Sequence, residues 1–312
     1  MNFQPSKNRL TSYPPVSIAL CTYNGAAFLA QQLETILNQT YPNITEVVCV
    51  DDCSSDETFS ILNQFALRDG RIHVFQNSSN LGYIRNFEKA LTLTKEPFIA
   101  LSDQDDLWYP TKIARSVAAI GTNLLVYSDS EYINEQNKKT GKKLSDFRRL
   151  GEEMNVLNLA LFNVVAGHTM MIRRELLVQS MPFHPQVPHD YWLAFQAIKC
   201  GNISFVDEVL VGYRQHTTNV IGALGSKNKY KHKATCQVHE RLTAFSDSLK
   251  GFNAEHQVFL RNLSEFYSDL TWWKKIRKVS FFWKHQKELL QVKKRNIFRK
   301  RFYCIQMYWR DA

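Results

Sequence analysis

The fold is decided by the stretch Phe98-Ile-Ala-Leu-Ser-Asp-Gln-Asp-Asp-Leu-Trp-Tyr-Pro110. Its first four residues are an apolar run typical of a buried strand, and three carboxylates follow almost at once. An aromatic pair and Pro110 then stop the chain from continuing as a strand. In open α/β sheets, ligands bind outside the carboxyl ends of the strands. The stretch therefore predicts a site for a metal ion and an anionic ligand.

Asp103, Asp105 and Asp106 repel one another, which opposes folding unless a cation or several hydrogen-bond donors neutralise them. Mg²⁺ or Mn²⁺ accepts one or two carboxylates and takes its remaining ligands from water and substrate phosphate. A solvated, hydrogen-bonded loop is the alternative, because Asp-x-Asp tripeptides are common by chance. An EF-hand calcium loop is excluded, since its sixth and twelfth positions would be Trp108 and Ala114.

Strand and helix patterns alternate before this stretch. Apolar runs at 16–21, 47–50 and 72–75 predict strands, and amphipathic patterns at 28–37, 61–65 and 83–93 predict helices. The residues Ser54-Ser-Asp-Glu57 match a capping box for the second helix. This order predicts an α/β fold with a mostly parallel sheet flanked by helices. No G-x-G-x-x-G follows the first strand, but Tyr23 could stack on a nucleotide base and Asp52 could accept from it.

The composition bounds the class of protein. The 312 residues are 44% hydrophobic, and no apolar run of about eighteen residues occurs, so we expect a cytosolic protein that is soluble or peripheral to a membrane. The six cysteines show no C-x-x-C spacing and are expected to be reduced. Residues 225–312 hold 20 Lys/Arg and 7 Asp/Glu, about +13, whereas residues 1–224 are about −3. This asymmetry predicts a boundary near 222–226 and a separate role for the tail.

Four segments together carry a family resemblance. They are Cys21-Thr-Tyr-Asn-Gly25, Val50-Asp-Asp-Cys-Ser-Ser-Asp56, Asn80-Leu-Gly82 and Ser102-Asp-Gln-Asp-Asp106. In this order they resemble glycosyltransferase family 2, nucleotide-sugar transferases with a GT-A fold. The resemblance continues through Gly167–Met171, His189–Trp192 and Tyr213–His216, which are most similar to the bacterial rhamnosyltransferase branch of surface-polysaccharide synthesis. It covers roughly residues 14–222 and implies a Rossmann-like GT-A domain with a basic helical extension.

The resemblance implies a donor and metal site. Thr22, Tyr23, Asp52 and Asp103 would bind the donor, with Tyr23 and Asp52 at its base and Asp103 on the ribose side. Asp105 would hold a metal, Mg²⁺ or Mn²⁺, that bridges the diphosphate of a dTDP- or UDP-sugar. His216 resembles the family's late metal ligand, although an isolated histidine is often structural. Asp106 is left open: it would contact metal-bound water or cap the next helix.

Asp190 is the residue that the resemblance implies as catalytic base, and a helix N-cap is the alternative for an aspartate in this position. A base acting directly on the acceptor implies inversion in a single displacement. If the donor were dTDP-L-rhamnose, the product would be an α-L-rhamnoside. Trp108 and Trp192 are candidate platforms for the acceptor sugar, although tryptophans are more often simply packed.

Two segments depart from a simple pattern. The family usually has glycine where this chain has Cys53, so we expect Cys53 to adopt a backbone conformation open to a side chain. Residues 131–153 are basic and without clear periodicity. They predict a mobile loop between a strand at 124–127 and a helix at 154–162, acting as a lid, an acceptor clamp or a solvated insertion.

The leading hypothesis is an inverting, metal-dependent glycosyltransferase that acts on a glycan or lipid-linked acceptor in the bacterial cytoplasm. A catalytically silent scaffold subunit of a polysaccharide assembly complex is the alternative, and nucleic-acid binding by the tail ranks last. Large aromatic residues alternate with cations at 271–284, which predicts a tether to an anionic membrane surface. A helical hairpin that packs its aromatic residues on the catalytic domain is the other interpretation.

Overall fold

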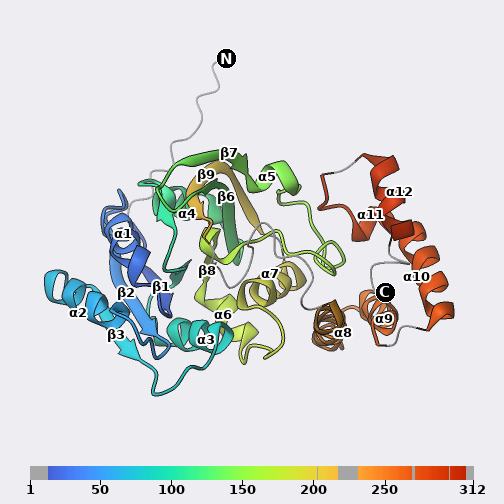
Figure 1. Ribbon diagram of the computed structural model, residues 1–312, viewed down its shortest axis with the longest axis horizontal. Helices are drawn as coiled ribbons and strands as arrows, with labels where there is room; N and C mark the ends of the chain where they lie inside the picture. Colours follow the sequence, from blue (N-terminus) through green and yellow to red (C-terminus); the bar gives the residue numbers. More distant parts are fainter. Residues whose placement is uncertain (1–12, 202, 217–230, 269–270, 295, 307–312) are drawn as a thin grey trace, which may run out of the picture.

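A computed structural model describes residues 13–201, 203–216, 231–268, 271–294 and 296–306. This part of the chain forms an α/β body followed by a group of helices (Figure 1). The strands are β1 (Val16–Thr22), β2 (Ile44–Asp51), β3 (Ile72–Gln76), β4 (Phe98–Ser102), β5 (Leu107–Trp108), β6 (Leu125–Ile133), β7 (Lys139–Lys143), β8 (Met171–Arg173) and β9 (Ser204–Arg214). The predicted boundary at 222–226 lies outside the described residues.

The helices of the body cover the sheet, and those of the tail follow it. The body has α1 (Ala26–Leu37), α2 (Thr58–Arg68), α3 (Tyr83–Leu93), α4 (Lys112–Ile120), α5 (Leu144–Phe147), the 3₁₀ turn η1 (Gly167–Thr169), α6 (Arg174–Ser180) and α7 (His189–Cys200). The tail has α8 (Lys231–Ser248), α9 (Ala254–Glu265), α10 (Trp272–Lys284), α11 (Gln286–Leu289) and α12 (Ile297–Gln306). No helix among the described residues has the length and apolar character needed to cross a membrane.

One mixed sheet runs through the body in the order β3-β2-β1-β4-β8-β6-β9-β5, with β7 paired to β6. The four strands from β3 to β4 are parallel, as predicted. The pairing of β8 with β4 and β6 is antiparallel, as are the pairings of β5 with β9 and β7 with β6. The parallel half therefore brings the carboxyl ends of β1, β2 and β4 to one edge.

Alternate residues of the central strands supply two hydrophobic cores, because successive side chains of a strand point to opposite faces. Ile18 and Leu20 of β1 belong to the core on the side of α1, α2 and α4. Ala19 and Cys21 belong to the other core, with residues of α3 and α7. Both cores bury strand residues completely, so the strand ends that carry polar side chains are held on a rigid base.

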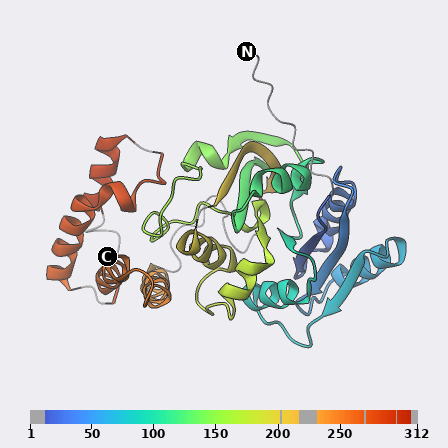
Figure 2. The ribbon, with the colours of Figure 1, turned by 180° about the vertical axis from the view of Figure 1, so that it is seen from behind.

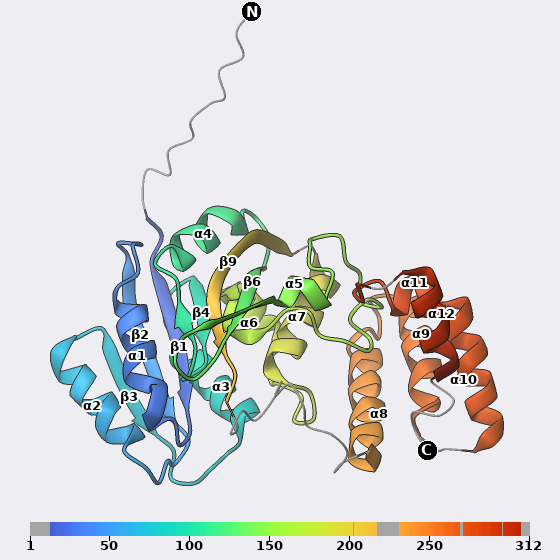
Figure 3. The same cartoon turned by 45° about the horizontal axis from the view of Figure 1, so that its top comes forward.

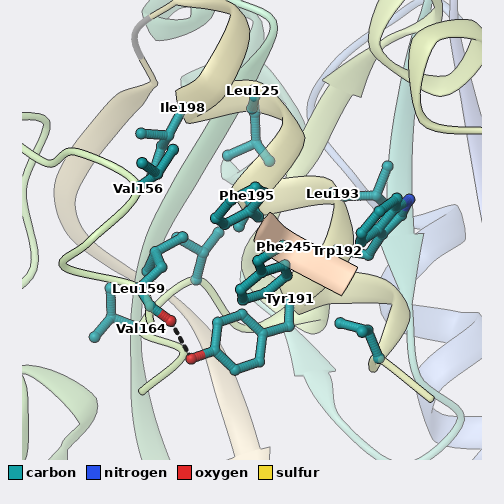
Figure 4. Packing of buried hydrophobic residues seen from close by; sticks show 14 of the residues in the cluster. Leu125, Val156, Leu159, Val164, Tyr191, Trp192, Leu193, Phe195, Ile198 and Phe245 are labelled. Carbon is teal, nitrogen blue, oxygen red and sulfur yellow. Dashed lines mark hydrogen bonds between the residues drawn. The ribbon is translucent and has the colours of Figure 1, made fainter. Parts of the chain in front are cut away.

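The tail helices gather at one end of the body, farthest from α2, in both opposite views (Figures 1 and 2). Figure 3 shows α8 between α7 and the remaining tail helices. Phe245 of α8 stacks on Phe195 of α7 with ring centroids 3.9 Å apart (Figure 4). Residues of α9, α10 and α11 join the same core. The tail is thus anchored to the body by buried aromatic packing.

Residues 131–162 differ from the prediction. In place of a mobile loop, β6 extends to Ile133 and forms a hairpin with β7, whose turn is closed by Asn134 Oδ1 accepting from the Gln136 and Lys138 N–H groups. The predicted helix at 154–162 is also wrong. There, the side chains of Asn155 and Asn158 accept from nearby backbone N–H groups and so compete with helical hydrogen bonds.

The segment 51–57 also corrects two expectations. The capping box is not formed: α2 begins at Thr58, and the Ser54 hydroxyl donates to Asp51 Oδ1 over 2.5 Å. Cys53 has a φ of +63°, the left-handed region that favours glycine, so our expectation of an ordinary conformation is wrong. The neighbours explain this, because the side chains of both Asp51 and Asp52 are fixed by hydrogen bonds from backbone N–H groups.

We expect Cys53→Gly to stabilise the protein. The change relieves about 1–2 kcal/mol of left-handed strain and costs about 0.5–1 kcal/mol of chain entropy, so the net gain is on the order of 0.5–1 kcal/mol. Urea unfolding measures it. Cys200→Gly is the matched control, because Cys200 is also exposed but lies at the end of α7 with negative φ. A stabilisation of equal size in both variants, or none in Cys53→Gly, would contradict the explanation.

Candidate active site

The loops after β1, β2 and β4 meet at the carboxyl edge of the parallel strands. The Tyr23 N–H donates to Gln104 Oε1 over 2.8 Å, and Gln104 Nε2 donates back to the Tyr23 carbonyl over 3.0 Å. The Asn24 N–H donates to the Ser54 hydroxyl over 2.9 Å. A Cβ at Gly25 would overlap the Gln104 amide, so a larger residue would push that amide away from its two hydrogen bonds with Tyr23. The three loops therefore form one connected surface.

The residues predicted to bind the donor lie on this surface in different surroundings. Tyr23 is exposed, whereas Thr22 is buried and its hydroxyl donates to Asp51 Oδ1 over 2.9 Å. Asp52 is buried as well. Its carboxylate accepts from the N–H groups of Leu81 and Gly82 over 2.8 and 2.9 Å, and so fixes the predicted turn before α3.

Asp105 and His216 are brought together from distant parts of the chain. Asp105 Oδ2 and His216 Nε2 are 2.7 Å apart, although the residues belong to the loop after β4 and the segment after β9. The His216 ring also packs against Phe28 of α1, with centroids 4.9 Å apart. A carboxylate oxygen and an imidazole nitrogen this close together can both serve as ligands of one divalent ion, such as Mg²⁺ or Mn²⁺.

Asp106 is fully buried, whereas Asp103 and Asp105 are both partly exposed. Burial raises the pKa of Asp103 to about 7, and the charges of Asp105 and Asp190 act in the same direction. The pKa of Asp106 is raised well above its usual range by burial and by the charges of Asp105 and Asp103. Asp106 Oδ1 accepts from the Arg214 N–H over 3.1 Å, and the N-cap of α4 is Thr111. Asp106 therefore does not cap the next helix.

A second group of ligand atoms lies deeper. Asp103, Asp106 and His168 each offer one atom, and these atoms lie within 4.8 Å of one another. Asp106 Oδ2 and His168 Nε2 are buried and have no hydrogen-bond partner among the described residues. Burial lowers the pKa of His168 to about 3, so its ring is neutral and able to ligate. These ligand atoms, two carboxylate oxygens and a neutral imidazole nitrogen, are of the kinds that bind a divalent cation.

Arg214 neutralises the acidic loop from behind. Its guanidinium donates to the Asp105 carbonyl over 2.7 Å and to Gln31 Oε1 over 3.0 Å. It also donates to Asn137 Oδ1 in the β6–β7 turn over 2.5 Å and lies 4.7 Å from the Phe28 ring centroid. One buried cation therefore connects the acidic loop with α1 and the hairpin.

Asp190 lies in the first turn of α7 and is only partly exposed. Its Oδ1 accepts from the Tyr191 N–H over 2.7 Å, and its Oδ2 accepts from Asn163 Nδ2 over 2.9 Å. Burial raises its pKa to about 6, against hydrogen bonds from Tyr191, Gly167 and Asn163 that lower it. The N-cap of α7 is Pro188, so the cap interpretation of Asp190 is wrong. Asp190 also adjoins η1, since a Cβ added at Gly167 would lie 3.4 Å from Asp190 Cβ, and its charge helps to raise the pKa of Asp103.

The family model described as Glycosyl transferase family 2 matches residues 17–179, more than half of the chain. The chain belongs to glycosyltransferase family 2. The UDP-Glc:alpha-D-GlcNAc-diphosphoundecaprenol beta-1,3-glucosyltransferase WfaP of Escherichia coli is 30% identical over 249 residues, which is 78% of this chain and 89% of that protein. A glycosyltransferase of Haemophilus influenzae, described as uncharacterized, is 26% identical over 214 residues, 65% of this chain and 66% of that one.

This glycosyltransferase also resembles a solved structure. The crystal structure of S. aureus TarS 1-349 in complex with UDP-GlcNAc matches with a TM-score of 0.63 and 16% identity, covering 95% of this chain and 88% of that one. The predicted GT-A fold is confirmed. Neither relative carries the name of a rhamnosyltransferase, so the resemblance to that branch remains a prediction.

The two tryptophans predicted to contact the acceptor of the glycosyltransferase are largely covered. Trp108 is 2% exposed, and the Lys112 ammonium lies 3.7 Å from its ring centroid. Trp192 is 9% exposed, its Nε1 donates to the Ser180 carbonyl over 2.8 Å, and its ring stacks with Phe245. Both tryptophans therefore have the surroundings of packed interior side chains.

Some residues of the site were not predicted from the sequence. Arg214 and His168 lie inside segments that carry the family resemblance, but their roles depend on burial, which no local pattern reports. Lys112 looks like an ordinary surface lysine at the start of a helix. Asn163 follows an apolar run that resembled a helix, and only the fold brings it to Asp190.

Proposed function

We propose that this glycosyltransferase is an inverting, divalent-cation-dependent enzyme that moves a hexosyl group from a UDP-sugar to a lipid-linked glycan in polysaccharide synthesis. The observation that carries the proposal is the electrostatic interaction among three acids: the charges of Asp105 and Asp190 both raise the pKa of Asp103. We infer that the Asp105–His216 pair, which would hold the metal, and the Asp190 carboxylate, whose pKa is raised to about 6, face one space. The UDP donor and lipid-linked acceptor follow the name of the Escherichia coli relative.

In this mechanism, Tyr23, Asp52 and Asp103 bind and orient the nucleoside of the donor. Asp105 and His216 would hold the cation, which would supply stabilisation of the developing charge on the diphosphate leaving group. Asp190 accepts the proton of the acceptor hydroxyl as its oxygen bonds to the anomeric carbon. The bond to the diphosphate breaks on the opposite side, so the configuration inverts without a covalent enzyme intermediate.

The tail supplies a surface suited to the membrane that carries such an acceptor. We define the tail face as the exposed residues Trp273, Ile276, Trp283, Phe298, Phe302 and Ile305. They recur at i, i+3 and i+10 on α10 and at i, i+4 and i+7 on α12, so each set occupies one side of its helix. The two sides adjoin, because the Arg301 guanidinium lies 5.4 Å from the Trp283 ring centroid.

Charge favours an anionic lipid surface as the occupant of the tail face. Exposed cations flank it on both helices, among them Arg277, Lys284, Arg299 and Arg301. Aromatic side chains favour the membrane interface, and each cation near an anionic leaflet contributes about 1 kcal/mol. Phe282 of the same helix is buried in the core, so α10 packs one side on the body while it exposes the other. We infer peripheral binding at the inner face of the cytoplasmic membrane.

We expect Asp105→Asn to abolish transfer and to weaken Mn²⁺ binding at least about tenfold, because it removes a charged ligand. Mn²⁺ titration followed by electron paramagnetic resonance measures binding, and release of UDP or dTDP from a panel that includes UDP-glucose and dTDP-L-rhamnose measures turnover. Asp146→Asn, an exposed acid on α5, is the matched control. Full turnover of the wild type with a chelator would overturn the cation requirement. Release of dTDP alone would identify dTDP-L-rhamnose as the donor instead of a UDP-sugar.

We expect Asp190→Asn to bind the donor normally and to lose about 10²- to 10⁴-fold in transfer rate, the usual contribution of a general base. The base is active when deprotonated, so the wild-type rate should fall as the pH drops through about 6, the pKa of Asp190. Donor binding by calorimetry and transfer rates between pH 5 and 9 test this. A loss below tenfold would exclude Asp190 as the base, and a scaffold protein would show no transfer at all.

For the tail, we expect Phe298→Ala/Phe302→Ala to weaken binding to anionic vesicles at least about tenfold, because burying each phenylalanine contributes about 1.5–3 kcal/mol. These side chains are 75% and 60% exposed. Co-sedimentation with phosphatidylglycerol or phosphatidylcholine vesicles at low and high salt measures the effect. Leu67→Ala is the control, since Leu67 is 91% exposed on α2 at the opposite end. Equal binding to neutral and anionic vesicles would contradict the charge argument.

A further inference from the structure

Among the described residues, Asn163 is the one whose side chain donates a hydrogen bond to the Asp190 carboxylate. Its Nδ2 donates to Asp190 Oδ2 over 2.9 Å and to the Val165 carbonyl over 3.0 Å. Its Oδ1 accepts from the Val165 N–H over 3.0 Å. These contacts use both N–H groups of the amide and one of the two lone pairs of its oxygen. The side chain therefore joins the turn at 163–165 to the first turn of α7.

The orientation of the Asn163 amide is fixed by chemistry. In the reversed orientation, its oxygen would face the Val165 carbonyl and the Asp190 carboxylate, both of which only accept when the acid is ionised. The Val165 N–H would then face an NH₂ group. The observed orientation leaves donors opposite acceptors at every contact. Asn163 consequently presents a donor to Asp190 at all times and favours the ionised form of the acid.

The segment that carries Asn163 is held on both sides. Val164 and Val165 are buried in the core, and the Tyr191 hydroxyl donates to the Leu159 carbonyl. The same core includes Phe195 and Phe245, whose packing fixes α7 against α8 (Figure 4). The donor and the carboxylate thus sit on elements that share one packed interior. A hydrogen bond between such elements keeps its geometry when a substrate binds.

The other titratable neighbours of Asp190 do not favour its charge. Asp103 comes from the loop after β4, Tyr83 from α3 and Tyr191 from α7, and the charge of Asp190 raises the pKa of each. His189 lies next in the chain, and burial lowers its pKa to about 3, so its ring is neutral. The backbones of Tyr191 and Gly167 are the remaining donors. Asn163 is therefore the side chain whose removal changes the pKa of Asp190 most directly.

We propose that Asn163 is a positioning residue that keeps the Asp190 carboxylate ionised and orients it, with Oδ2 fixed by the amide and the carboxylate aimed at the acceptor hydroxyl. This proposal rests on the proposed role of Asp190 as the base. It assigns to Asn163 no contact with the substrate. Its signature is a change in the pH at which transfer begins, which a residue that only stabilises the turn would not produce.

The test is Asn163→Asp, which keeps the shape and the oxygen that accepts from the Val165 N–H but replaces the donor by an acid. The transfer rate should fall at low pH, where Asp190 is protonated, and we call this part of the pH profile the acidic limb. We expect the acidic limb to move up by about one to two pH units, because the free energy of a hydrogen bond to a charged group corresponds to a pKa change of that size. The rate at pH 6 should then fall about tenfold or more and recover toward the wild-type value near pH 9. The affinity for UDP should not change.

Asn158→Asp is the matched control. Asn158 lies in the same segment and makes the same kinds of contact, accepting from the Asn155 N–H over 2.8 Å and donating to the Glu288 carbonyl over 2.9 Å. It contacts the tail instead of Asp190, so we expect a lower melting temperature with an unmoved pH profile. Asn163→Ala removes the donor without adding a charge, and should also move the limb upward.

An unmoved acidic limb in both Asn163 variants, with transfer still abolished by Asp190→Asn, would overturn the positioning role and leave the base in place. Normal transfer by Asp190→Asn would overturn both proposals, because the limb would then belong to another group. A limb that moves equally in Asn158→Asp would show a general effect of loosening the segment, and would also refute a specific role for Asn163. Thermal unfolding of each variant establishes that the folded protein is being measured.

Discussion

Repulsion among the three carboxylates after β4 is the constraint on which the rest of the site depends. Two of them, Asp103 and Asp106, have raised pKa values because burial adds to the charges of their neighbours. Arg214 offsets part of this repulsion. Its backbone N–H donates to the Asp106 carboxylate, and its guanidinium donates to the Asp105 carbonyl. A strand end crowded with acids is stable only with such partners, and a bound cation would add to them.

The parallel half of the fold was predictable because its signals are local. The helix at Tyr83–Leu93 is delimited by a glycine before it and by an amphipathic pattern within it, and the structure has the same bounds. The carboxyl-edge location of Asp52 and Asp103 followed from strand order alone. Nothing local predicted the antiparallel insertion of β8 between β4 and β6, since three residues carry no periodicity that distinguishes a strand.

The errors share a physical cause: polar side chains bonded to the backbone in ways that a pattern of hydrophobicity does not report. Asn155 and Asn158 replace helical hydrogen bonds with their own, so an apolar run that resembles a helix becomes a series of turns. Asn134 closes the hairpin turn by accepting from the Gln136 and Lys138 N–H groups, in a segment that lacks apolar residues. Cys53 keeps a glycine-like φ because the side chain of its neighbour Asp52 is fixed by the backbone N–H groups of Leu81 and Gly82.

The same hairpin connects the site with the tail, a link that composition could not reveal. Arg214 donates to Asn137 at the tip of the hairpin, while the Arg149 N–H beyond its base donates to the Val292 carbonyl and Lys294 donates to the Ser145 carbonyl. The basic insertion and the basic tail, separate in sequence, are therefore neighbours in space. A tail face held by lipid would fix one end of this hairpin, and the acidic loop is bonded to the other. The orientation of the site toward a lipid-linked acceptor would then follow from contacts within the protein.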